Sequence, residues 1–175
     1  MTLRVTLVFL VCLVAMVAES VFPFIFGLSR ARADLLLSVV LYLALNDEPI
    51  SGASLSAVAG YLGEIGSATP PGLYTFLAVL TWVVVRLSAR GLRADGGPLS
   101  AMVAFVACIV HSLLAAAVFY LVAPAPADFH FPIGAALLSA LMTALAAPIV
   151  FGVLRRIDSL FIPSGGEQHL PRGLR

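Results

Sequence analysis

The chain has 175 residues, of which 61% are hydrophobic and 11% are charged, and its formal net charge is +1. Soluble domains average about 45–50% apolar and ~25% charged residues, so this composition excludes an ordinary water-soluble protein. The small net charge, without any cluster of basic residues, also argues against nucleic-acid binding. Because a transmembrane helix needs about 20 residues, the chain has room for roughly five or six such helices with short connections.

The first apolar segment follows Arg4 and runs through 5–18, with apolar residues resuming at 21–26. Together these runs are long enough to cross a bilayer. A cleaved signal peptide is the alternative, but Ala18 lacks a small-x-small cleavage pattern and further hydrophobic segments follow. We therefore expect a transmembrane helix here.

The second and third segments are shorter than the usual span. They are expected at about 34–45 and 53–65, and each is below the ~20-residue norm. We therefore expect these helices to be tilted or shielded by their neighbours. The tight turn between them contains Asp47 and Glu48, which we expect in a solvated loop.

The fourth segment begins after Pro70, Pro71 and Gly72 and is expected to end near Leu87. Proline suits the start of a helix, because the first turn has no amide partner to lose. Trp82 lies near the expected cytosolic end of this segment, the position typical of an interfacial aromatic residue.

The last two segments, at about 99–122 and 131–154, are the clearest. Long, continuously apolar runs predict helices, whereas a membrane barrel would need alternating strands of ~10 residues. The predicted fold class is all-α, a polytopic membrane helix bundle of about six transmembrane helices.

Arginine predicts the orientation, because cytoplasmic loops carry the excess of basic residues. All ten basic residues are arginines, and with six spans only Arg30 and Arg32 fall outside. The inside set is Arg4, Arg86, Arg90, Arg93, Arg155, Arg156, Arg172 and Arg175. We therefore expect both termini in the cytoplasm, with one transmembrane domain at 1–158 and a flexible tail at 159–175.

Two ionisable residues lie within the apolar segments. A charged side chain inside a membrane is energetically costly, so each such residue is a candidate functional site. Glu19, near the outer end of the first segment, could line a cavity or pair with Arg30 or Arg32, but interfacial placement is favoured. His111 lies deep in the fifth segment. It could relay protons or bind a ligand, but a neutral ring hydrogen-bonded to a neighbouring helix is favoured.

Three further charged residues lie at the expected outer side of the second and third segments. Arg32 and Asp34 open the second segment and Glu64 closes the third. Opposite charges placed there could form a partly buried network. Asp34 also suits the first turn of a helix, because a carboxylate there complements the helix dipole.

Small residues recur every four positions in the last two segments, which places them on one face of each helix. Helices in lipid associate through such faces, so we expect them to contact each other or a partner helix, although an alanine-rich chain also yields this spacing by chance. In the third segment, glycines permit close approach or mark a frayed end. The residues are Ala104, Cys108, Ser112 and Ala116; Ala136, Ala140 and Ala144, beside Ala135, Ser139, Thr143 and Ala147; and Gly60, Gly63 and Gly66.

No motif for catalysis or metal binding is present. The chain lacks a Walker loop, HExxH and GxSxG, and its three histidines are far apart. Cys12 and Cys108 have no CxxC or Cys/His spacing, so we expect two buried small hydrophobic residues. Catalysis would need a nucleophile with a base, paired carboxylates or metal ligands. We therefore predict no enzyme activity and no cofactor or metal.

Four passages, taken in order, are spread over positions 32–156, which is most of the chain. They are Arg-Ala-Asp-Leu-Leu-Leu-Ser-Val-Val-Leu-Tyr-Leu-Ala-Leu at 32–45, Gly-Tyr-Leu-Gly-Glu at 60–64, Pro-Gly-Leu-Tyr at 71–74 and Ala-Pro-Ile-Val-Phe-Gly-Val-Leu-Arg-Arg at 147–156. In order and spacing the chain resembles the bacterial rod shape-determining MreD family. It departs from the family at Glu64, where aspartate is common, and an extra residue or two precedes Pro71-Gly72.

The resemblance implies a six-helix fold similar to the substrate-binding subunits of energy-coupling-factor vitamin transporters. It implies an MreC-type partner anchored by one membrane helix, and it implies MreB filaments and the peptidoglycan glycosyltransferase and transpeptidase as further components. The implied role is a non-catalytic scaffold of lateral peptidoglycan synthesis in the bacterial inner membrane. The alternative is a small-molecule-binding subunit of a membrane transporter. Candidate partner-interaction or buried polar positions are Glu19, Arg32, Asp34, Gly60, Gly63, Glu64, Pro71, Gly72, His111, Ala136, Ala140 and Ala144.

Overall fold

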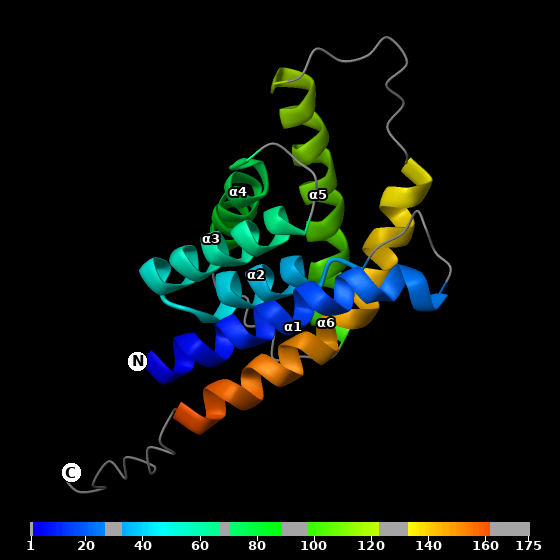
Figure 1. The fold of residues 1–175 in the computed structure, drawn as a ribbon. Helices are drawn as coiled ribbons and strands as arrows, with labels where there is room; N and C mark the ends of the chain where they lie inside the picture. The colour runs from blue at the N-terminus through cyan, green and yellow to red at the C-terminus, as the bar shows by residue number, and fades with distance from the viewer. Residues whose placement is uncertain (1, 27–32, 67–70, 89–97, 123–132, 162–175) are drawn as a thin grey trace, which may run out of the picture.

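The structure is a computed structural model that describes residues 2–26, 33–66, 71–88, 98–122 and 133–161. These residues form six helices, and the ranges contain no strand. The helices are α1 (Thr2–Phe26), α2 (Leu35–Asn46), α3 (Pro49–Ile65), α4 (Leu73–Ser88), α5 (Pro98–Val122) and α6 (Ile133–Phe161) (Figure 1). The predicted all-α bundle of about six helices is confirmed.

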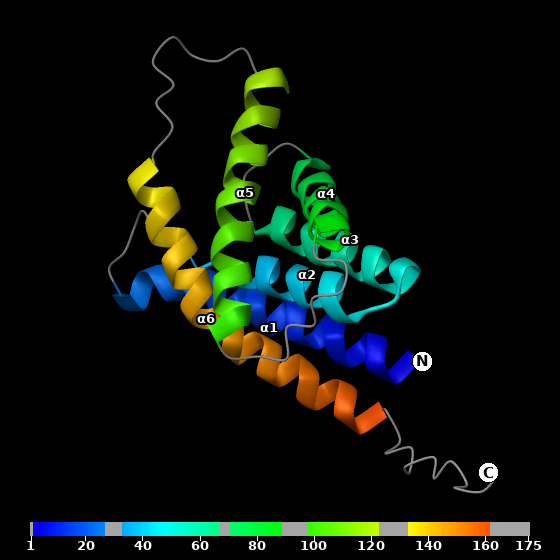
Figure 2. The same cartoon turned by 180° about the vertical axis from the view of Figure 1, so that it is seen from behind.

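α2 lies at the centre of the bundle. Every residue from 36 to 44 is buried, as expected for a helix that is apolar on all sides. α2 contacts each of the other five helices. Within the described ranges, those five form a closed ring in the order α1, α3, α4, α5, α6 and back to α1. Figures 1 and 2 show opposite sides of this bundle, with α2 among the other helices in both.

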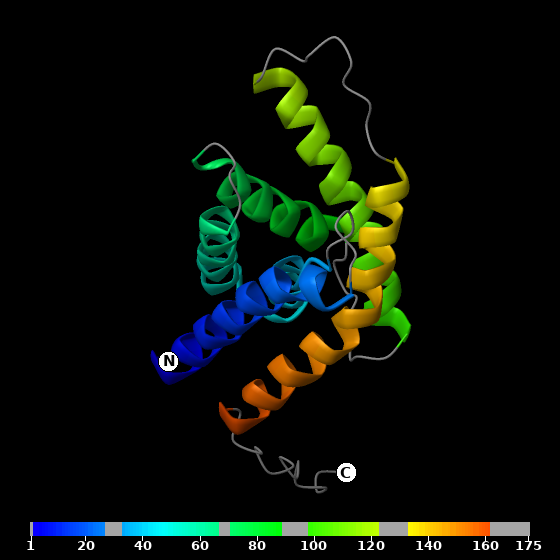
Figure 3. The ribbon, with the colours of Figure 1, turned by 45° about the vertical axis from the view of Figure 1, so that its right-hand side comes forward.

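Helix length divides the bundle into two groups. α1, α5 and α6 are long and apolar enough to cross a membrane, whereas α2, α3 and α4 have 12, 17 and 16 residues. Figure 3 shows α3 and α4 above and to the left of α1, and α6 to the right of and below it. The shielding predicted for the short second segment is observed, because the ring surrounds α2.

Two helix boundaries differ from the sequence prediction. α3 begins at Pro49 rather than near 53, because proline fits the first helical position and leaves a turn of only two residues after α2. α6 continues to Phe161 and contains Pro148, which removes a backbone hydrogen bond and permits the bend visible in Figure 1. Of the predicted tail, residues 162–175 lie outside the described residues.

α3 and α4 form an antiparallel pair that approaches closely at Gly60. A Cβ atom at Gly60 would lie 2.7 Å from Thr75 Cα and 2.8 Å from the Tyr74 carbonyl oxygen. Gly63 has ordinary contacts, and Gly66 caps the C-terminus of α3. The close approach considered for these glycines is therefore made at Gly60, where the neighbouring atoms belong to the backbone.

Substitution of Gly60 by alanine tests this packing. Because the added methyl group meets backbone atoms that cannot rotate away, we expect G60A to lower the free energy of unfolding by about 1–3 kcal/mol. The matched control is G152A on α6, where a Cβ atom meets nothing within 4 Å. Thermal unfolding in detergent should separate the two variants, and equal midpoints would contradict the packing.

Candidate functional site: polar clusters at the two ends of α2

The two ends of α2 carry backbone groups that need hydrogen-bond partners. Twelve residues span about 18 Å, whereas the hydrocarbon core of a bilayer is about 30 Å thick. The first amide and last carbonyl groups of a helix have no partner within the helix, and leaving them unpaired in an apolar environment is costly. Nearby side chains bond several of these groups, and they form two sets, the N-terminal cluster and the C-terminal cluster of α2.

The N-terminal cluster consists of Glu19, Asp34 and Thr143. Asp34 is the N-cap, and its Oδ1 accepts a hydrogen bond from the Leu37 amide at 2.7 Å. Glu19 of α1 accepts from the Leu36 amide at 2.7 Å, and the Asp34 amide donates to Thr143 Oγ1 of α6 at 2.9 Å. Two carboxylates at a helix N-terminus complement the helix dipole. The cluster therefore ties α1 and α6 to the start of α2.

A cavity of about 290 Å³ lies beside the N-terminal cluster. Glu19, Asp34 and His111 are among its polar lining residues. His111 Nδ1 lies 2.9 Å from Thr81 Oγ1, so the ring joins α5 to α4, the arrangement favoured by the sequence. The candidate residue Arg32 lies outside the described residues.

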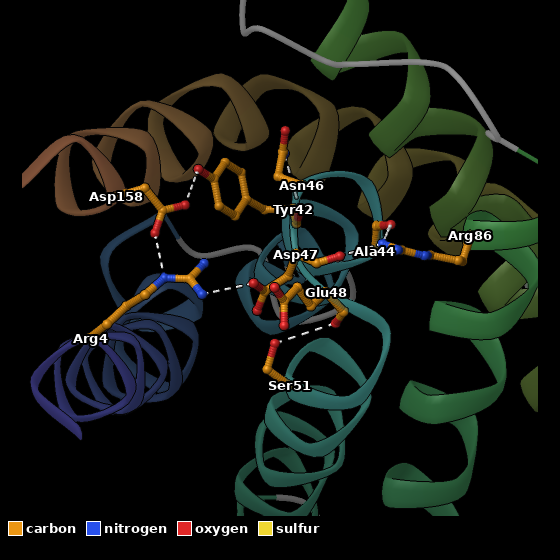
Figure 4. Close-up of polar contacts among 9 residues, drawn as sticks. All are labelled: Arg4, Tyr42, Ala44, Asn46, Asp47, Glu48, Ser51, Arg86 and Asp158. Atoms are coloured by element: carbon orange, nitrogen blue, oxygen red, sulfur yellow. Dashed lines mark hydrogen bonds and ion pairs between the residues drawn. The ribbon is translucent and has the colours of Figure 1, made fainter. Parts of the chain in front are cut away.

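The C-terminal cluster is centred on Arg4 of α1 (Figure 4). Its Nη1 lies 2.7 Å from Asp47 Oδ1, and its Nε lies 2.7 Å from Asp158 Oδ1 of α6. The Tyr42 hydroxyl of α2 donates to Asp158 Oδ2 at 2.7 Å. One guanidinium group therefore joins the start of α1 to the ends of α2 and α6.

Arg86 of α4 caps the C-terminus of α2. It donates to the Ala44 carbonyl at 3.1 Å and to the carbonyl of Asp47, and its guanidinium carbon lies 5.7 Å from the Trp82 ring centroid. A cation at this position complements the negative end of the helix dipole. A carbonyl group in the last turn of α2 is thus bonded by a different helix.

Two expectations for this end of the bundle are wrong. Asp47 is not in a solvated loop, because its side chain is 4% exposed and bonded to Arg4, whereas Glu48 is exposed as expected. Trp82 is not interfacial, because it is 7% exposed and packs between Arg86 and α3. In both cases packing against a neighbouring helix replaces contact with water.

Glu64 bonds groups at the start of α4, and its predicted network with Arg32 involves a residue outside the described ranges. Its carboxylate accepts from the Gly72 amide and, at 3.0 Å, from the Thr75 hydroxyl. These contacts join the end of α3 to the start of α4. Pro71 and Gly72 are exposed in the turn, and Gly72 has a φ of 90°, which favours glycine.

The small-residue faces of the last two helices pack against each other. Cys108 Sγ lies 3.8 Å from Thr143 Oγ1, and Ala140 is fully buried. Ala144 is 7% exposed, whereas Ala136 is only half-buried. Ala140 and Ala144 are therefore used inside the chain and do not offer a face to a partner helix.

The bonds of Arg4 with Asp47 and Asp158 were not predicted from the sequence. Arg4 and Asp158 are separated by 154 positions, so no local pattern reveals their contact. The available signal was coarse: each residue lies at the expected cytoplasmic end of its segment. Within the described ranges, no three His, Cys, Asp or Glu side chains are grouped to hold a metal ion.

Comparison with known proteins identifies the family. The model of the rod shape-determining protein MreD family matches residues 1–157, from α1 into the last turns of α6. The chain belongs to the MreD family. It is therefore a bacterial membrane protein of rod-shape determination, and MreD is not a known enzyme family. No curated protein and no solved structure matches, so the likeness to transporter subunits stays a prediction.

Removal of the Arg4 charge tests the C-terminal cluster. R4M leaves the buried Asp47 carboxylate without its cation, so we expect a loss of about 3 kcal/mol in the free energy of unfolding. R156M, which removes an exposed arginine of α6, is the matched control and should change stability by less than about 0.5 kcal/mol. Equal effects in detergent unfolding would contradict a structural role for Arg4.

Proposed function

We propose that this protein is a non-catalytic scaffold of the cell-elongation (rod) complex in the inner membrane. It binds an MreC-type partner and helps to control lateral peptidoglycan synthesis and cell shape. The family match across residues 1–157 carries this proposal. MreB filaments and the peptidoglycan glycosyltransferase and transpeptidase are the proposed further components of the complex.

The roles of the charged side chains support a scaffold. Arg4 bonds both Asp47 and Asp158, Arg86 donates to a carbonyl near the end of α2, and Asp34 caps its start. Each of these groups holds one helix to another or completes a helix end. A catalytic site would instead need ionisable groups directed at a substrate.

We further propose six membrane crossings with both termini in the cytoplasm. The start of α1 and the ends of α2, α4 and α6 meet at the C-terminal cluster, as alternating crossings require. Arg155 and Arg156 follow on the same end of α6. Because cytoplasmic ends carry the excess of arginine, this end of the bundle is assigned to the cytoplasm.

Depletion and cross-linking in a rod-shaped host test the proposed function. We expect rounded cells on depletion, with rescue by the full chain. A photo-crosslinking amino acid at outward-facing positions of α1, at Val14, and of α5, at Leu113, maps the partner face. Trapping of an MreC-type protein from at least one face is expected, whereas unchanged rods and no trapped partner would overturn the scaffold proposal.

A second function, small-molecule binding within a transporter, is favoured by the cavity beside Asp34 and His111. Native mass spectrometry of protein purified in nanodiscs distinguishes the two functions. For a scaffold we expect no stoichiometric small molecule, and A115L, which places a larger side chain in the cavity wall, should leave cells rod-shaped. A bound molecule that A115L expels would favour the transporter subunit.

A further inference from the structure

The outer face of α6 shows how long an apolar stripe this protein presents to lipid. Its exposed apolar residues recur every four positions: Ile133, Leu137, Leu141, Leu145, Ile149 and Val153. Measured along the helix, which bends at Pro148, twenty steps from residue 133 to residue 153 correspond to a path of about 30 Å at 1.5 Å per residue, which equals the thickness of a hydrocarbon core. The exposed Arg155 and Arg156 follow immediately. The apolar path along α6 is therefore as long as an ordinary hydrocarbon core is thick.

The outer face of α3 is much shorter. Its exposed residues form one stripe: Ile50, Ser54, Val58, Tyr61 and Ile65. Fifteen steps along this stripe give about 22 Å, and Ser54 is polar. Glu48 precedes the stripe and Gly66 follows it, both exposed. The apolar height of α3 is thus about 8 Å below that of the α6 stripe and of the hydrocarbon core.

α4 shares this short height, because its 16 residues span about 24 Å in total. Phe76, Val83 and Leu87 mark its exposed apolar face. α3 contacts neither α5 nor α6 within the described ranges, so the short and tall faces lie on different sides of the bundle (Figure 3).

α3 and α4 are fixed to each other and to α2, so they cannot shift along the membrane normal to lengthen their combined apolar face. Gly52 packs against Trp82 at one end of the α3–α4 pair, and Glu64 bonds the Gly72 amide at the other. Arg86 also fixes α4 to the C-terminus of α2. Tilting would shorten the height of α3 and α4 along the membrane normal, so the bilayer itself must adapt.

We propose that the α3–α4 face thins the adjacent bilayer by about 8 Å while the α6 face leaves it unperturbed. The protein therefore favours thin membranes and imposes an uneven thickness on its surroundings. This inference rests on the six-crossing topology of the proposed function. The α3–α4 face therefore contacts lipids with short acyl chains, and this contact involves no charged binding site.

Depth measurements with single nitroxide labels test the proposal on the full chain. Cys12 and Cys108 are replaced by alanine, and cysteine is introduced at Ile50, Ile65, Ile133 or Val153, all exposed positions. The labelled proteins are reconstituted in phosphatidylcholine vesicles with 18:1 acyl chains. The α6 labels are the matched control, because their separation fits an unperturbed bilayer.

We expect all four labels at the same shallow depth below the phosphates, because the bilayer follows the short stripe. An α3 label deeper than the α6 labels by 4 Å or more would show an unthinned bilayer and overturn the inference. A membrane-impermeant thiol reagent then reports sidedness. If Ile50 and Ile65 positions react from opposite sides, the topology stands independently of the depth result; reaction from one side would overturn both the crossing of α3 and the inference.

The chain length of the lipid provides a second readout. In competition between nanodiscs of 14:1 and 22:1 phosphatidylcholine, we expect at least a fivefold preference for the 14:1 lipid. Equal distribution between the two lipids would contradict the proposed preference for thin membranes.

Discussion

The structure depends on one constraint: a twelve-residue apolar helix is buried inside a ring of five others, and its two ends need polar partners there. Backbone groups unpaired in an apolar environment are costly, so the neighbouring helices supply them. Glu19 and Asp34 accept from the Leu36 and Leu37 amides at the start of α2, and Arg86 donates to the Ala44 carbonyl in its last turn. The signs agree with the helix dipole at both ends. The same bonds that satisfy α2 therefore hold α1 and α4 in place.

This arrangement connects the fold with the proposed function. Because charged side chains join helices, the bundle presents mainly apolar faces outward, and lipid or another membrane helix is the natural contact. The central position of α2 also explains how a helix of about 18 Å can be one of the six proposed crossings, because its ends bond neighbouring helices instead of reaching the bilayer surface. The short α3 and α4 beside the long α5 and α6 give the surface two different heights. A scaffold built in this way influences its surroundings through shape and contact, without a chemical step.

The sequence predicted the features that depend on local pattern. Long apolar runs gave α1, α5 and α6, a carboxylate before an apolar run gave the start of α2 at Asp34, and ordered motifs indicated the family. Contacts between distant residues were not predictable, because Arg4 and Asp158 meet only once the ring closes. Trp82 was misplaced for the same reason: its burial depends on Gly52 of α3, and periodicity within α4 does not reveal it. The partners of Glu64 depended on the geometry of the turn after α3.

Hydrogen exchange at the start of α2 tests the central constraint most directly. First-turn amides of a helix normally lack partners and exchange rapidly. The account predicts slow exchange at Leu36 and Leu37, whose amides donate to Glu19 and Asp34, and fast exchange at the first-turn amides of α6, such as Gly134. NMR of the protein in nanodiscs can resolve these amides individually. Exchange at Leu36 and Leu37 as fast as at Gly134 would contradict a buried α2 held at its ends.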